Sequence, residues 1–337
     1  MPLTIKLSVL DQSPIRSGAT PADAIRETVE LAQAADRFGY ARYWLAEHHA
    51  SSGLAGSAPE ILVGRVAGAT ERIRVGSGGV MLSHYSPLKV AETFKLLETM
   101  YPGRIDLGIG RAPGSDGLTA AALAYGSQVG IEYFPARIAD LQAFLTDSTP
   151  ATPAFARVKA TPHTDTVPEL WLLGSSDGSA KLAAHFGAAF SFAYFINPHG
   201  GEAIMGMYRD EFQPSTELEK PAGSLCVFVV CADTEDRAAY LAKSRNLWRI
   251  QLEKGELGPY PTPEDAEAYP YSDSERLRIA ERSATNIVGT PDQVKPQIEA
   301  LADRFGVDEI MVLTITHDFA ARIRSYELVA RAFDLAT

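Results

Sequence analysis

An acid and two histidines stand side by side directly after a short apolar stretch. Glu47, His48 and His49 follow Trp44-Leu45-Ala46, which has the composition of a buried strand. In parallel β/α barrels, catalytic side chains sit at the carboxyl ends of the strands. Imidazole, whose ordinary pKa is ~6.5, can exchange protons near neutral pH or bind a metal ion. The triplet therefore indicates an acid–base site, a metal site or a packed corner of the fold.

A metal site would need further ligands at neighbouring strand ends. His84 and His317 are candidates, but no His-x-His motif follows the first expected strand. The sequence therefore disfavours a metal ion, and we expect none.

Glycines and one arginine mark the ends of the next two strands. The segment 76–79 contains three glycines, which weaken a strand unless another backbone or a flat ligand approaches closely. A β-bulge that helps to close a barrel is the alternative explanation, and both can hold. Gly108-Ile109-Gly110-Arg111 is superficially similar to a dinucleotide-binding motif, but Pro113 replaces the third glycine. Arg111 then remains as a cation at a strand end, suited to an anion.

A serine-rich turn follows the fifth expected strand. Gly174-Ser175-Ser176-Asp177 leads into a helical pattern, and free amides at a helix start form a natural phosphate site. Ordinary capping by Ser176 or Asp177 would explain the turn in isolation. With Arg111 on the neighbouring strand, a phosphate bound between the two is the better explanation, because Coulomb attraction and oriented amides act together.

Apolar strands alternate with helical patterns along the whole chain. A capping residue followed by proline starts several helices, as at Thr20-Pro21, Ser86-Pro87 and Thr290-Pro291, and the second helix is expected over 58–72. Such alternation is typical of a parallel sheet covered on both faces, and eight strands are the number that closes a (β/α)8 TIM barrel. The expected strands are 5–10, 43–46, 73–80, 105–110, 169–174, 188–195, 224–231 and 308–313.

Three longer segments interrupt this alternation and are expected as insertions at the C-terminal face of the barrel. Residues 118–133 and 146–168 are polar or small-residue connections. Residues 254–274 contain four prolines, too many for a helix, and the segment is too long for an ordinary turn. We expect a loop over the barrel mouth, acting either as an active-site lid or as an ordered surface excursion.

The composition bounds the remaining classes. The chain has 337 residues, 46% of them apolar, and 42 acidic against 31 basic residues give a net charge of −11. This balance disfavours a nucleic-acid or acidic-membrane partner, and no apolar run reaches the ~18 residues of a spanning helix. Cys226 and Cys231 lie five apart on one expected strand, so they face opposite sides and should not form a disulfide. These features favour a single-domain cytoplasmic protein over 1–337, without a signal peptide.

Taken together, these segments resemble the bacterial luciferase-like flavin monooxygenases. The resemblance covers nearly the whole chain and is carried by 43–49, 79–87, 103–111, 174–176 and the tail 318–330. It implies a (β/α)8 barrel that binds reduced FMN at the carboxyl ends of its strands. It also implies a non-proline cis peptide bond near Gly79-Val80-Met81, on the strand against which the isoalloxazine ring would lie.

The resemblance also assigns residues to roles. It implies that His48 is an acid–base group, and we expect Glu47 and His49 to fix its orientation. The flavin would be bound by residues of the third to fifth strands, with the phosphate on the arginine and the two serines: Gly79, Val80, Met81, Ser83, Arg111, Gly174, Ser175 and Ser176. The expected substrate pocket is lined by Gln12, His49, Gly110, Tyr133 and Phe195. Gly110 stands where the luciferase catalytic subunit has a reactive cysteine, which argues against light emission from a long-chain aldehyde.

The implied activity is that of an FMNH2-dependent monooxygenase. Such an enzyme uses O2 to form a flavin C4a-hydroperoxide and oxidises a small organic substrate. A separate flavin reductase would supply FMNH2, because no nicotinamide-binding motif is present. A deazaflavin (F420)-dependent hydride-transfer enzyme, a non-catalytic flavin-binding accessory protein and a metal hydrolase remain alternatives.

Family members commonly pair through the helices after strands two and three. In this chain the segment 58–71 is rich in small residues, which permit close helix approach. A symmetric homodimer is therefore expected.

Overall fold

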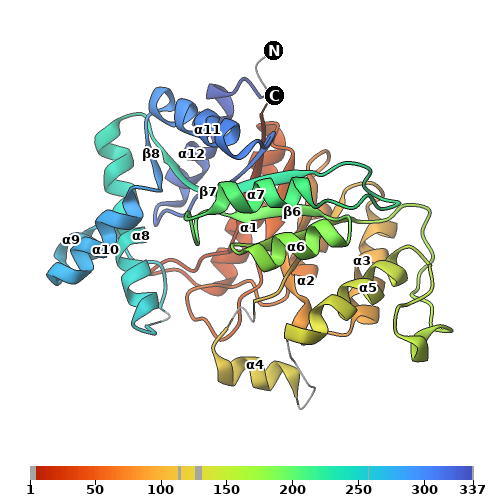
Figure 1. The fold of residues 1–337 in the computed structure, drawn as a ribbon. Coiled ribbons are helices and arrows are strands. Elements are labelled where there is room, and N and C mark those ends of the chain that lie inside the picture. The colour runs from red at the N-terminus through yellow and green to blue at the C-terminus, as the bar shows by residue number, and fades with distance from the viewer. Residues whose placement is uncertain (1–4, 113–114, 126–130, 257, 336–337) are drawn as a thin grey trace.

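The computed structural model describes residues 5–112, 115–125, 131–256 and 258–335. Eight parallel strands hydrogen-bond in the order β6-β5-β4-β3-β2-β1-β9-β7, and a β6–β7 pairing closes the ring. The chain is therefore a (β/α)8 barrel with helices around it, as predicted (Figure 1). The barrel strands are β1 (Lys6–Asp11), β2 (Arg42–Leu45), β3 (Arg74–Met81), β4 (Ile105–Gly110), β5 (Glu169–Gly174), β6 (Ala189–Ala193), β7 (Gly223–Cys231) and β9 (Glu309–Leu313).

A further short strand lies beside the barrel. β8 (Ile287–Gly289) pairs in parallel with the end of β7. This strand was not predicted, because three residues are too few to show a hydrophobic period. The eight barrel strands themselves lie within two residues of their predicted ends.

The helices that cover the barrel begin where the capping signals predicted. Thr20 accepts a hydrogen bond from the backbone of Asp23 and completes a capping box, and Pro21 occupies the first turn. The covering helices are α1 (Pro21–Arg37), α2 (Pro59–Ala67), α3 (Pro87–Met100), α5 (Phe134–Leu145), α6 (Asp177–His185), α7 (Gly201–Asp210), α8 (Glu235–Glu253), α11 (Pro291–Phe305) and α12 (Phe319–Ala332). None of the described helices is long and apolar enough to cross a membrane.

The predicted end of the second helix was wrong. α2 ends at Ala67 rather than near Arg72. The carboxylate of Asp36 explains the early end, because it accepts hydrogen bonds from the backbone amides of Glu71 and Ile73. Those amides therefore find their partner outside a helix.

The insertions hold more helix than predicted. α4 (Gly117–Ala124) lies within the first connection, of which residues 126–130 fall outside the described part of the chain, and it stands apart from the other helices in Figure 1. The segment 254–274 contains α9 (Pro263–Ala268) and the start of α10 (Asp273–Ser283), so its prolines do not exclude helix. Pro263 is tolerated because it occupies the first turn behind the Thr262 cap. Three single 3-10 turns complete the elements: Leu82–His84, Ile131–Tyr133 and Pro153–Phe155.

Successive residues of a strand alternate between the barrel interior and the layer under the helices. On β7, Cys226 and Phe228 belong to the interior cluster with Trp44 and Trp248. Cys231 belongs to the cluster shared with the surrounding helices. The two cysteines are free and buried on opposite faces, as predicted.

Charged side chains link the strands at the base of the barrel, at the end opposite the Glu47-His48-His49 triplet. The guanidinium of Arg42 lies on β2 and donates hydrogen bonds to carboxylates of Asp106, Glu169 and Glu309. These carboxylates come from β4, β5 and β9. One arginine thereby joins four strands and leaves the carboxyl ends free to carry the site.

Candidate active site

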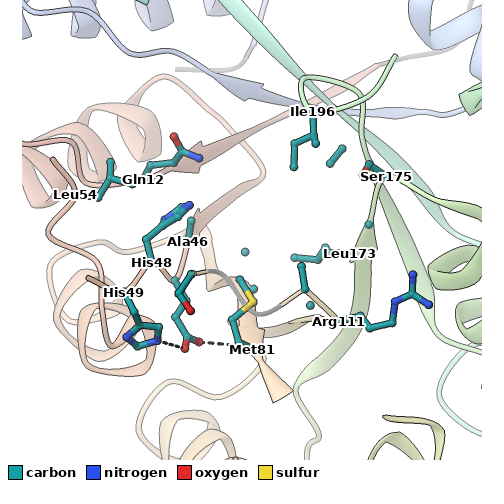
Figure 2. A pocket seen from close by; sticks show the side chains of 18 of the residues that line it. Gln12, Ala46, His48, His49, Leu54, Met81, Arg111, Leu173, Ser175 and Ile196 are labelled. Carbon is teal, nitrogen blue, oxygen red and sulfur yellow. Dashed lines mark hydrogen bonds and ion pairs between the residues drawn. The ribbon is translucent and has the colours of Figure 1, made fainter. Parts of the chain in front are cut away.

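A cavity of about 1200 Å3 opens at the carboxyl ends of the barrel strands. Its walls come from the ends of β1 to β6 and from one side each of α4 and α8. In Figure 2, His48 projects from one side, while Arg111 and Ser175 lie on the other. The structure thus brings most of the predicted residues to one cavity: Gln12, His48, His49, Gly79, Met81, Ser83, Gly110, Arg111, Gly174, Ser175, Ser176 and Phe195.

Glu47 is the structural centre of the triplet. Its buried carboxylate accepts hydrogen bonds from the Met81 amide at 2.9 Å and the Tyr85 hydroxyl at 2.6 Å. The same carboxylate lies 2.6 Å from Nε2 of His49 (dashed in Figure 2). Glu47 therefore ties the end of β2 to the end of β3 and positions His49.

His48 differs from its neighbours because its ring is left without such a partner. Its Nδ1 atom is buried and makes no hydrogen bond, although the side chain lines the cavity. Burial and the nearby His49 lower the pKa of His48 to about 4. The ring is therefore neutral at pH 7. We expected Glu47 and His49 to orient His48, but the structure shows no hydrogen bond between either residue and the His48 ring.

A candidate anion site lies at the start of α6. Nη2 of Arg111 is 3.3 Å from the Ser176 hydroxyl, and Ser176 occupies the N-cap position without bonding its helix. A Cβ atom at Gly178 would lie 2.7 Å from Nη1 of Arg111, so the guanidinium rests directly on the first turn. A cation, a hydroxyl and open helix amides together form a phosphate-binding arrangement.

The glycines of β3 serve the packing of the protein itself. The ladder between β3 and β4 shifts register between Ser77 and Val80, which is the predicted bulge. A Cβ atom at Gly79 would lie 2.8 Å from the Gly108 carbonyl oxygen, so neighbouring backbone excludes a side chain there. The peptide bond between Gly78 and Gly79 is cis, next to the expected position, and both residues also line the cavity.

Two predicted site residues lie elsewhere. Val80 is buried in the layer between barrel and helices, because it alternates with Gly79 and Met81 along the strand. Tyr133 is 43% exposed and is not among the residues that line the cavity. Tyr133 was predicted to line the pocket only because it follows the fourth expected strand.

One wall of the cavity is not predicted by the sequence. Arg245, Trp248 and Arg249 of α8 line it, together with the small residues Ala120 and Ala121 of α4. The signal available was a helical stretch with two arginines four residues apart, which places both on one face. Ordinary solvated helices show the same spacing, so the pattern alone could not reveal the cavity.

The segment 254–274 contributes Gly255 to this cavity. Elsewhere it is attached to the body of the protein, since Tyr260 is buried and its backbone bonds Ile15 and Ser17. A lid function for this segment stays a prediction.

No group of three His, Cys, Asp or Glu side chains among the described residues could hold a metal ion. His317, one of the ligands considered, lies instead 2.9 Å from the backbone carbonyl oxygen of Ser17.

The sequence model of the family described as luciferase-like monooxygenase matches residues 5–309. The chain belongs to the luciferase-like monooxygenase family. It is 38% identical to the N-acetyl-S-alkylcysteine monooxygenase of Bacillus subtilis (strain 168), over 97% of this chain and 98% of that protein. A luciferase-like monooxygenase of Escherichia coli (strain K12) is also 38% identical, with 96% of each chain covered.

Solved structures of similar proteins share the architecture of this chain. The crystal structure of apo-MsnO8 superposes with a TM-score of 0.90 at 39% identity, covering 98% of this chain and 99% of that one. Two more distant structures share the fold alone: the oxygenating constituent of 3,6-diketocamphane monooxygenase in complex with FMN (TM-score 0.72, 19% identity) and an F420-dependent secondary alcohol dehydrogenase (TM-score 0.67, 17% identity). The fold therefore accepts either a flavin or a deazaflavin.

Proposed function

We propose that this chain is an FMNH2-dependent monooxygenase that oxidises a small organic substrate with O2. One observation carries the proposal. A single cavity combines an arginine at a helix N-terminus, suited to a phosphate, with a histidine whose ring is neutral at pH 7.

The residues of the cavity fit FMN. Arg111, Ser175 and Ser176 would bind its phosphate at the start of α6. Gly79 and Met81 on β3 would form the surface beneath the ring. The cavity volume of about 1200 Å3 exceeds the ~300–1,000 Å3 typical of small-molecule sites, which leaves space for a substrate beside the cofactor.

When bound between Arg111, the serines at the start of α6 and the β3 surface, reduced FMN would supply the activation of O2 and the oxygen transfer to the substrate. The chain contributes binding, exclusion of water and proton handling. The neutral ring of His48 lines the cavity and would exchange a proton with a molecule bound there. Glu47 keeps the ends of β2 and β3 in register, so that His48 and the β3 surface face the same space.

A separate reductase is the proposed source of reduced flavin, and two copies are proposed to pair through α2 and α3. Three apolar side chains on these helices support the pairing, because Ile61, Leu96 and Met100 are each at least half exposed. Burial of such side chains between copies would remove them from water.

Reaction of the protein with photoreduced FMN and then O2 tests the proposal. We expect an oxygen-reactive flavin species that outlives free reduced FMN in the same buffer. His48→Ala should shorten its lifetime, whereas His185→Ala, on the exposed side of α6, should not. Reoxidation at the same rate with and without protein would refute the proposal. Parallel titration with F420 tests the hydride-transfer alternative, which gains support if F420 binds more tightly than FMN.

A further inference from the structure

Two arginines on α8 face the cavity from the side opposite the glycine-rich strand. Arg245 and Arg249 lie one helical turn apart, and both line the cavity. α8 follows β7, which lies four positions from β3 around the eight-stranded ring. The arginines therefore approach the cavity from across the barrel.

Neither arginine has an anionic partner within the described residues. No carboxylate of that part of the chain lies within 4.0 Å of either guanidinium, although Arg245 is only 5% exposed. Arg245 stacks on the ring of Phe228, with its Cζ atom 3.7 Å from the ring centroid. Arg282 lies in the neighbourhood of both arginines, but its own charge is paired with Glu253.

The carboxylates of the cavity wall are already engaged elsewhere. Glu47 binds the Met81 amide, Tyr85 and His49. Asp116 caps α4 through the amides of Leu118 and Thr119. The cavity thus contains two positive charges, buried Arg245 and half-buried Arg249, that no carboxylate of the described chain neutralises.

An unpaired buried charge is costly, and it needs a counter-charge from a ligand to be stabilised. Burial lowers the pKa of Arg245 to about 9, so the guanidinium is still protonated at pH 7. The FMN phosphate has its own place at Arg111 and α6, on the β4–β5 side of the ring. The arginines of α8 are therefore free for a second anion.

We propose that Arg245 and Arg249 bind a carboxylate of the substrate and hold its oxidisable part toward His48 and the β3 surface. This inference rests on the proposed function, because it names the class of molecule that the monooxygenase would oxidise. A planar guanidinium binds a carboxylate through two parallel hydrogen bonds, which fixes orientation as well as charge.

The test compares an acid with its uncharged amide on one carbon skeleton. The probe is N-acetyl-S-benzylcysteine and its primary amide, titrated into the apo protein by calorimetry. We expect the acid to bind at least ten times more tightly than the amide, and Arg245→Met to remove that preference. Arg237→Met is the matched control on the same helix, because Arg237 pairs with Asp318 outside the cavity and its loss should leave the preference intact.

Further measurements separate a binding role from a structural one. Arg245→Met should unfold at the same temperature as the wild type or higher, because it removes a buried charge without a partner. Equal binding of acid and amide, or no binding of the acid, would overturn the proposal while leaving FMN binding and O2 reactivity intact. A selective loss of FMN over riboflavin affinity in Arg245→Met would also overturn it, since the arginine would then serve the cofactor. Failure of FMN to bind the wild type would refute the proposed function instead, and the acid–amide comparison on apo protein would still decide the inference.

Discussion

Gly178 at the start of α6 offers a direct test of the phosphate site. A methyl group at this position would lie 2.7 Å from Nη1 and 3.3 Å from Cζ of Arg111. Ordinary van der Waals contact begins near 3.4 Å, so Gly178→Ala displaces the guanidinium by several tenths of an ångström. The backbone conformation is helical, and alanine should not destabilise it.

The expected loss of FMN affinity follows from the hydrogen bonds that Arg111 would donate to the phosphate. A hydrogen bond to a charged group contributes about 1.5–3 kcal/mol, and ~1.4 kcal/mol corresponds to a tenfold change in Kd. Removal of the charge in Arg111→Met should therefore weaken FMN binding roughly 10- to 150-fold. Displacement of the Arg111 guanidinium in Gly178→Ala should cost about 1 kcal/mol of FMN binding free energy, which raises the Kd roughly fivefold.

Quenching of flavin fluorescence on binding gives the dissociation constants of FMN and riboflavin for each variant. Riboflavin lacks the phosphate, so its affinity should be unchanged in both variants. Gly206→Ala on α7 is the matched control, because a Cβ atom there meets nothing within 4 Å. The reasoning is refuted if FMN and riboflavin lose affinity by the same factor, or if Arg111→Met leaves FMN binding unchanged.

Three more predictions follow from particular side chains. Because the pKa of His48 is lowered to about 4, its contribution to the oxidation rate should be constant from pH 8 to 5.5 and should fall below about pH 4; a midpoint near 6.5 that disappears in His48→Ala would contradict this. Arg42→Met leaves the buried carboxylate of Glu309 without its cation, whereas Asp106 and Glu169 keep their contact with Arg74, and it should cost about 3–5 kcal/mol of unfolding free energy in urea titrations. Arg42 lowers the pKa of Glu309 against the effect of burial, so its loss raises that pKa further in the folded state; the deficit should then be smaller at pH 5 than at pH 8, and a deficit that does not change with pH would count against the argument. Ile61→Asp places a charge on the exposed apolar side chains of α2 and α3 and should shift the mass measured by light scattering from dimer to monomer, whereas Leu277→Asp on α10 should not; an unchanged dimer would exclude this interface.

The architecture could be predicted because it depends on local patterns. Strand and helix periods, and the prolines at helix starts, are properties of neighbouring residues. The end of α2 depends on Asp36, which is distant in sequence and intercepts the next amides. The helix at Pro263 shows that a proline count is a weaker signal than the position of each proline relative to a cap.

The candidate site could be predicted only in part, for the same reason. His48, Arg111 and Ser176 follow strands directly, so the barrel topology alone brings them together. Glu47 contacts His49 and Met81, whereas Nδ1 of His48 has no hydrogen-bond partner. These contacts depend on the directions of the side chains, which residue spacing does not encode. Arg245 shows this most clearly, because the absence of a partner for a charge is a property of the folded chain only.

α4 is a short helix without buried residues that forms part of the cavity wall, and its hydrogen exchange should therefore depend on cavity occupancy. None of its eight residues is buried, and a helix of this length has little stability of its own in water. Its alanine side, at Ala120, Ala121 and Ala124, forms part of the cavity wall. A molecule in the cavity would supply the packing surface that α4 lacks, so its amide hydrogens should exchange more slowly when the cavity is filled. α4 is thus an intrinsic reporter of occupancy, which hydrogen exchange can follow without any label on the substrate.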